Sequence, residues 1–118
     1  MFKILDKTYG NLIAVEIDGH IEKKDYDKVT PLIDKSVREF GKVRLYILIT
    51  KIEGIEPQAF VEDVKTYFKH FRDFEKIAVV GNSKWQKFWL ELAAPFVSGK
   101  LKYFTHEQMI DAQTWSEV

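Results

Sequence analysis

The chain contains no cysteine among its 118 residues. This absence excludes disulfide bonds, thiolate catalysis and zinc sites that depend on cysteine ligands. No apolar run approaches the roughly 18 residues of a membrane-spanning helix. The first residues, Met1 to Ile4, lead directly into a strand-like pattern without a cleavable signal. We therefore expect a soluble cytoplasmic protein.

The sequence also lacks an excess of charge of either sign, since eighteen basic and eighteen acidic residues cancel. General nucleic-acid-binding domains usually carry an excess of basic residues, so we expect no nucleic-acid partner. Glycine is sparse, with six residues, and the Gly81-Asn-Ser-Lys-Trp segment has neither of the common glycine-rich phosphate-binding spacings. The residues thus predict neither a cofactor nor a metal site.

Apolar and aromatic residues are plentiful by comparison. The apolar content is 46%, and nine Phe, five Tyr and three Trp make up an aromatic content of 14%. A chain of this length and composition forms one ordinary globular domain, expected here over 1–118.

Strand-like alternation and helix-like spacing follow one another along the chain. Strands are expected at 2–6, 11–18, 43–49, 76–80 and 101–104, and helices at 23–40, 57–71, 83–97 and from Thr105 or His106 to about Trp115. Gly41 suits the end of the first helix, whereas Pro31 inside it predicts a kink or a late helix start.

The resulting order is β-β-α-β-α-β-α-β-α. It predicts an α/β domain with a mostly parallel five-stranded sheet, four helices and a first strand made antiparallel by its hairpin. A loop is expected through Lys51 to Glu56, between the third strand and the next helix.

The most informative stretch is 83–97, whose apolar residues cover about 180° of a helix instead of the usual ~100° stripe. Helix 57–71 is also unusually aromatic. Core packing explains most of these side chains, since burying each is worth about 2–3 kcal/mol. It explains Phe88 and Val97 least well, because they lie at opposite edges of the face. The expected ligand- or membrane-contacting residues are Phe60, Val64, Tyr67, Phe68, Trp85, Phe88, Trp89, Leu92 and Phe96.

A local basic excess accompanies these aromatic segments. The segment from Lys65 to Lys87 contains six basic residues and two acidic ones, Asp73 and Glu75. A solvated rim explains such an excess, and so does a surface that meets anionic lipid head groups or an acidic partner. The expected basic rim is Lys65, Lys69, Lys84 and Lys87.

Several motifs resemble those of the SpoIIAA-like proteins, small bacterial relatives of the STAS domain. They are the segment from Lys76 to Trp85, the Phe104-Thr-His-Glu-Gln stretch and the terminal Ala112-Gln-Thr-Trp115. The resemblance covers nearly the whole chain and implies the STAS fold. It also implies similarity to lipid-exchange domains of the CRAL-TRIO type, with apolar-ligand binding and membrane contact.

One feature of the STAS relatives is missing. Anti-sigma-factor antagonists carry a phosphorylatable Ser in an Asp-Ser-Ser/Thr-Gly motif after the strand that corresponds to 43–49. The junction here, Ile49 to Ile55, contains Thr50 but no Ser and no Asp. The phosphorylation switch is therefore not carried over to this chain.

The sequence leaves three functional hypotheses open. The leading one is a non-enzymatic module that binds an apolar ligand, a lipid or a membrane surface between helices 57–71 and 83–97. The second is a regulatory module that uses the same face for self-association or for a protein partner. The third is an enzyme that uses His20 and His106 at the carboxyl edge of the sheet.

Overall fold

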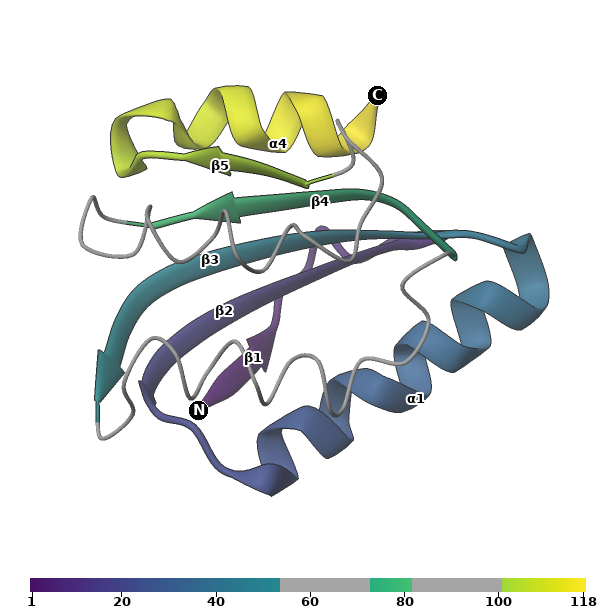
Figure 1. Ribbon diagram of the computed structural model, residues 1–118, viewed down its shortest axis with the longest axis horizontal. Coiled ribbons are helices and arrows are strands. Elements are labelled where there is room, and N and C mark those ends of the chain that lie inside the picture. The colour runs from purple at the N-terminus through teal and green to yellow at the C-terminus, as the bar shows by residue number, and fades with distance from the viewer. Residues whose placement is uncertain (54–72, 82–100) are drawn as a thin grey trace.

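The computed structural model describes residues 1–53, 73–81 and 101–118. In these residues five strands form one sheet, with a helix on each side of it (Figure 1). The elements in chain order are β1 (Phe2–Ile4), β2 (Leu12–His20), α1 (Lys23–Phe40), β3 (Val43–Glu53), β4 (Phe74–Val80), β5 (Leu101–Phe104), the 3₁₀ turn η2 (His106–Gln108) and α4 (Met109–Glu117).

The strand order across the sheet is the order along the chain, β1-β2-β3-β4-β5. The β1–β2 pair is antiparallel, and the other three pairs are parallel. The predicted mixed sheet with an antiparallel first strand is therefore confirmed. Of the four expected helices, 23–40 is found with the same bounds and the last one is α4, whereas 57–71 and 83–97 lie outside the described residues.

Side chains alternate between the two faces of the sheet and form two buried clusters. The α1 face is aliphatic and aromatic, with Tyr26, Val29 and Ile33 of α1 packed on the strands. The cluster on the α4 face combines small residues of the strands, Ala14 and Ala78, with the rings of Tyr46 and Phe104. Phe2 belongs to the α1 side, where its ring meets Tyr26 edge-on at 5.2 Å between centroids.

Helix α1 differs from its prediction at Pro31. The helix runs from Lys23 to Phe40 with Pro31 inside it, so the expected late start is wrong. Its apolar residues at helical spacing hold the helix on the sheet despite the hydrogen bond that proline removes. At the other end Gly41 adopts φ 74° and its N–H donates to the Val37 carbonyl at 2.8 Å, as the sequence predicts.

Two strand boundaries differ in a way that affects the site. Strand β3 continues to Glu53, so the loop expected from Lys51 is wrong for its first three residues. Strand β2 continues to His20 and pairs with β3 up to its end. Backbone pairing between these two strands, which the hydrophobic pattern does not report, extends both of them beyond their apolar cores.

Candidate functional site

The carboxyl edge of the parallel strands is stepped. The last pair between β3 and β4 is Leu48 with Val80, whereas β2 and β3 remain paired up to His20 and Glu53. Thr50 therefore lies within strand β3, exposed to solvent, with paired residues after it. At this position the hydroxyl has strand residues on both sides in sequence, and none of the helices described in the structure begins next to it to stabilise added negative charge.

The His106 side chain contacts β3 just beyond the point where its pairing with β4 ends. Its Nε2 lies 2.9 Å from the Ile49 carbonyl oxygen, so this imidazole nitrogen is the donor to a backbone group of β3. Next to it the Gly81 N–H donates to the Phe104 carbonyl at 3.0 Å. The Tyr103 ring lies close to Gly81, where an added Cβ would meet it at 3.4 Å. His106 thus completes the hydrogen bonding of the sheet.

His20 is not brought together with His106. It pairs with Glu53, four residues beyond the Ile49 that His106 contacts. At about 3.3 Å per residue this places the two contacts about 13 Å apart along the strands. In addition, each strand lies next to the strand that precedes it in the chain, in one direction across the sheet. Doubly wound sheets bind ligands at the point where this direction of strand order reverses, and the described sheet has no such point. The geometry therefore offers no shared histidine site.

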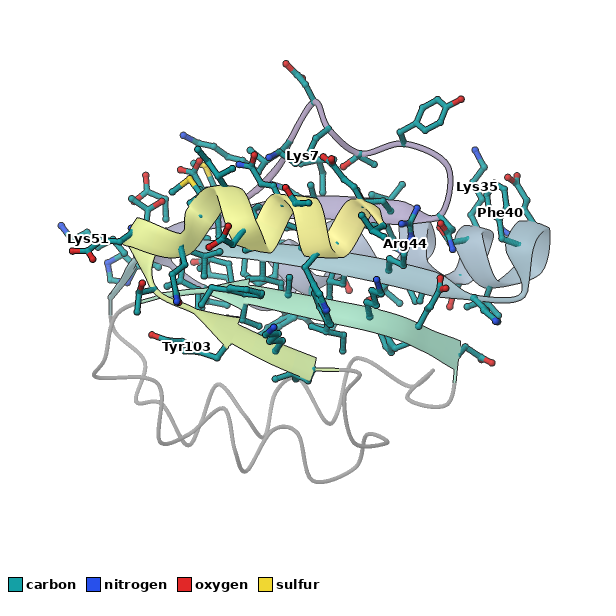
Figure 2. The ribbon with its side chains drawn as sticks, turned by 90° about the horizontal axis from the view of Figure 1, so that it is seen from above. Lys7, Lys35, Phe40, Arg44, Lys51 and Tyr103 are labelled. Carbon is teal, nitrogen blue, oxygen red and sulfur yellow. The ribbon has the colours of Figure 1, made fainter. Side chains whose placement is uncertain are left out.

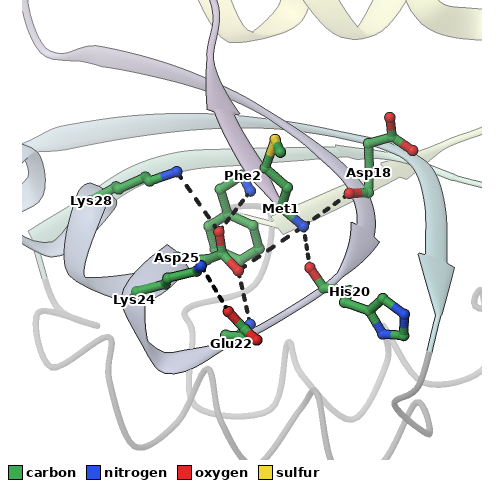
Figure 3. Close-up of polar contacts among 8 residues, drawn as sticks. All are labelled: Met1, Phe2, Asp18, His20, Glu22, Lys24, Asp25 and Lys28. Atoms are coloured by element: carbon green, nitrogen blue, oxygen red, sulfur yellow. Dashed lines mark hydrogen bonds and ion pairs between the residues drawn. The ribbon is translucent and has the colours of Figure 1, made fainter.

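A buried carboxylate lies nearby, where α1 begins (Figure 3). The Asp25 side chain, 2% exposed, accepts the N–H of Phe2 at 3.1 Å and the N–H of Glu22 at 2.8 Å. The N-terminal ammonium of Met1 lies 4.0 Å from it and also donates to the carbonyls of Asp18 and His20. This cluster joins the first strand to the first helix.

Opposing effects set the pKa of Asp25. Burial of the carboxylate raises it, but the two backbone N–H groups, the N-terminal ammonium and Lys28 together lower the pKa below its ordinary value of 3.8. Asp25 is thus an ionised group that helps to hold the fold together. The sequence signal for it was an acidic residue three positions after Glu22, at the start of an apolar helical repeat.

The predicted aromatic site and its basic rim all fall in 54–72 and 82–100, outside the described residues. One lysine of the same basic stretch, Lys76, is described. Its Nζ donates to the Trp115 carbonyl at 3.0 Å and lies 5.1 Å from the centroid of the Trp115 ring. Lys76 therefore binds the C-terminal end of α4 and does not extend a solvated basic rim.

A second cation completes this contact with α4. Arg44 donates from Nη1 to the Ser116 carbonyl at 2.9 Å and from Nε to the Asn11 side chain at 3.1 Å. The last carbonyls of a helix have no partners within the helix and carry partial negative charge. Arg44 and Lys76 thus fix α4 on the sheet, and Figure 2 shows Arg44 beside the C-terminal half of this helix.

Three hollows at the surface are lined by described residues, and the smallest of them lies beside Lys7 and Arg44. The first, of about 360 Å³, lies between the β1–β2 turn and α1, with Tyr9 and Phe40 among the residues that line it. These rings are 86% and 53% exposed. The second lies between β5 and α4, beside Trp115.

The comparisons with known proteins agree with this architecture. The sequence model of the SpoIIAA-like family matches residues 12–117 of this chain. The chain belongs to the SpoIIAA-like family. A solved structure with 25% sequence identity is similar over 98% of this chain and 93% of its own, with a TM-score of 0.68. It is an uncharacterized protein of the DUF3478 family from Shewanella loihica PV-4, described as having a SpoIIAA-like fold. A search of curated proteins finds no significant match.

The SpoIIAA-like chain shows two further properties in its described part. Across 1–53, 73–81 and 101–118, no helix combines the length and hydropathy needed to cross a membrane. In the same ranges, no three metal-binding side chains of the His, Cys, Asp or Glu type gather around a common point.

Proposed function

We propose that this SpoIIAA-like chain is a non-enzymatic module that binds an apolar ligand or a lipid surface through the aromatic residues of 57–71 and 83–97. The observation that carries the proposal is the apolar face of 83–97, about twice as wide as packing on a sheet requires. The basic rim beside these segments suits anionic head groups, which would make the protein a peripheral membrane protein.

The position of Thr50 supports control by a ligand instead of a kinase. A phosphate has its largest effect at a helix start or opposite arginines, where it creates new charge-assisted hydrogen bonds. Thr50 lies inside a paired strand, and the residues that follow it, Lys51 to Glu53, are still in β3. A phosphate there would not reach a helix N-terminus in the described part of the chain.

The two histidines support a non-enzymatic role in the same way. The Nε2 atom of His106 is hydrogen-bonded to the Ile49 carbonyl. His20 pairs with Glu53, about 13 Å further along the strands than Ile49. Catalytic groups must reach one substrate within hydrogen-bond distance. The arrangement is better explained by sheet stability than by acid–base chemistry.

Two measurements test the proposal. Native mass spectrometry of protein purified from cells should show a co-purified lipid or other apolar molecule. Flotation with anionic vesicles at low salt should recover the protein, and Phe88→Asp should weaken this binding at least tenfold. Phe40→Asp is the matched control, because Phe40 is an exposed phenylalanine of α1 outside both aromatic segments. A chain that carries no ligand and does not float would contradict the proposal.

A protein-interaction module is the second candidate, favoured by Tyr9 and Phe40. The fold leaves both rings largely exposed at the rim of one hollow, although burying a ring of this size is worth about 2–3 kcal/mol. Sedimentation at increasing concentration tests self-association. Association that Phe88→Asp or Phe40→Asp abolishes, without any dependence on lipid, would favour this candidate over the first.

A further inference from the structure

A groove of about 560 Å³ lies between β5 and the outer side of α4. We call it the Trp115 groove, and its main lining residues are Lys76, Lys102, Phe104, Asp111 and Trp115. Its volume falls within the range of small-molecule sites in proteins. Its lining residues do not belong to 57–71 or 83–97, so an inference about it does not depend on the proposed function.

The floor of the groove is aromatic. The Phe104 ring is buried under α4, and the Trp115 ring, half-buried, lies 6.0 Å from it between centroids at an angle of 54°. Such a tilted pair presents both a ring face and a ring edge, which suits an apolar or aromatic group placed against it.

The two lysines of the groove differ in how they are used. The Lys76 ammonium is bound to the Trp115 carbonyl. The Lys102 ammonium lies 5.4 Å from the Phe104 centroid and 6.0 Å from the Trp115 centroid, and in the described residues it forms no ion pair with a carboxylate. Lys102 is therefore an exposed cation held over two aromatic rings without an anionic partner in that part of the chain.

The charge of the groove defines its ligand further. Two ammonium groups line it, together with the Asp111 carboxylate and the terminal carboxylate of Val118, so its net charge is close to zero. A ligand with a single carboxylate suits this arrangement, because Lys102 supplies one ammonium without an ion pair in the described residues. A second negative charge on the ligand would meet the two carboxylates of the groove without a further unpaired cation to offset them. The aromatic floor in turn favours an anion with an apolar body.

We propose that the Trp115 groove binds a small monocarboxylate with an apolar or aromatic body. Its carboxylate pairs with Lys102, and its body packs on Trp115 and Phe104. Lys76 adds to the positive potential while its hydrogen bond to α4 stays in place, so binding requires no movement of the helix.

The test follows the indole N–H signals of ¹⁵N-labelled protein by NMR. Three tryptophans give three signals, and Trp115→Phe identifies the one of interest. The probes are 4-phenylbutyrate and the neutral 4-phenylbutanol. We expect phenylbutyrate to shift the Trp115 signal in a saturable way, with an affinity at least fivefold above that of the alcohol.

Two substitutions with opposite expected effects keep the test independent of folding. Lys102→Gln should weaken phenylbutyrate binding fivefold to tenfold, and Asp111→Asn should strengthen it severalfold. Lys35→Gln, in α1 on the other face of the sheet, is the control and should change nothing. Equal binding of acid and alcohol, or an affinity that neither groove substitution alters, would overturn the proposal. Failure here would leave vesicle binding and its sensitivity to Phe88→Asp untouched, so the two proposals can fail separately.

Discussion

The substitution Asp25→Asn tests how much the buried carboxylate contributes to the fold. Asparagine keeps the shape of the side chain but replaces one acceptor oxygen by a donor. One of the two backbone N–H groups, that of Phe2 or that of Glu22, then faces another donor in a buried place. An unsatisfied buried group costs about 1–3 kcal/mol. The ion pairs with Met1 and Lys28, at 4.0 and 3.9 Å and with exposed partners, add at most about 1 kcal/mol.

We therefore expect Asp25→Asn to lower the free energy of unfolding by about 2–3 kcal/mol. For a domain of this size the loss corresponds to a Tm roughly 6–15 °C lower. Urea unfolding followed by circular dichroism measures it. The matched control is Asp27→Asn, because the Asp27 carboxylate is 57% exposed and pairs only with Lys23 in the described residues. Its loss should stay below about 0.5 kcal/mol.

The pH dependence supplies an independent check. Because the folded-state pKa of Asp25 is lowered, its contribution is present above the ordinary pKa of 3.8 and is lost as the pH falls through the lower folded value. The difference in unfolding free energy between wild type and Asp25→Asn should therefore be largest near pH 6 and shrink in acid. An Asp25→Asn loss no larger than that of Asp27→Asn, or a difference independent of pH, would refute the reasoning.

Two further substitutions test buried and backbone features. Tyr46→Phe should leave stability unchanged or raise it by about 1 kcal/mol in urea unfolding, because the buried Tyr46 hydroxyl has no well-formed hydrogen bond in the described residues and only the Gln113 side chain near it. A loss above about 1 kcal/mol would mean that Gln113 satisfies the hydroxyl. Gly41→Ala should lower the Tm by an amount equivalent to about 1 kcal/mol, since residue 41 has φ 74° and an added Cβ meets nothing within 4 Å. If the Gly41→Ala variant were as stable as the wild type, α1 would have to end differently in solution.

The sequence predicted the elements whose hydrophobic spacing is regular. Helix 23–40 and strand 101–104 have the expected bounds, because apolar residues at fixed intervals report directly which face is buried. The ends of β2 and β3 were missed for a physical reason. Residues such as His20 and Lys51 pair through their backbones while their side chains stay exposed, so no hydrophobic pattern marks them.

The sites show the same limit. The predicted aromatic site rests on composition and remains a prediction, since its residues lie outside the described ranges. The Trp115 groove was not predicted, because the sequence indicates Trp115 only as the end of the last helix and as part of a family motif, and places Lys102 within the short last strand. Their proximity depends on how α4 crosses β4 and β5, and residue spacing along the chain carries no information about such a crossing.

The strand order has a consequence for how this protein is made. Each strand pairs with the one that precedes it in the chain, from β1 to β5. During synthesis every new strand therefore finds its docking edge already built, and none must wait for a partner translated later. In the described residues α4 packs back across strands made long before it, since it binds Arg44 of β3 and Lys76 of β4. The contacts that α4 makes with β3 and β4 therefore form last among those between the described elements, after Met109 to Glu117 have been synthesised.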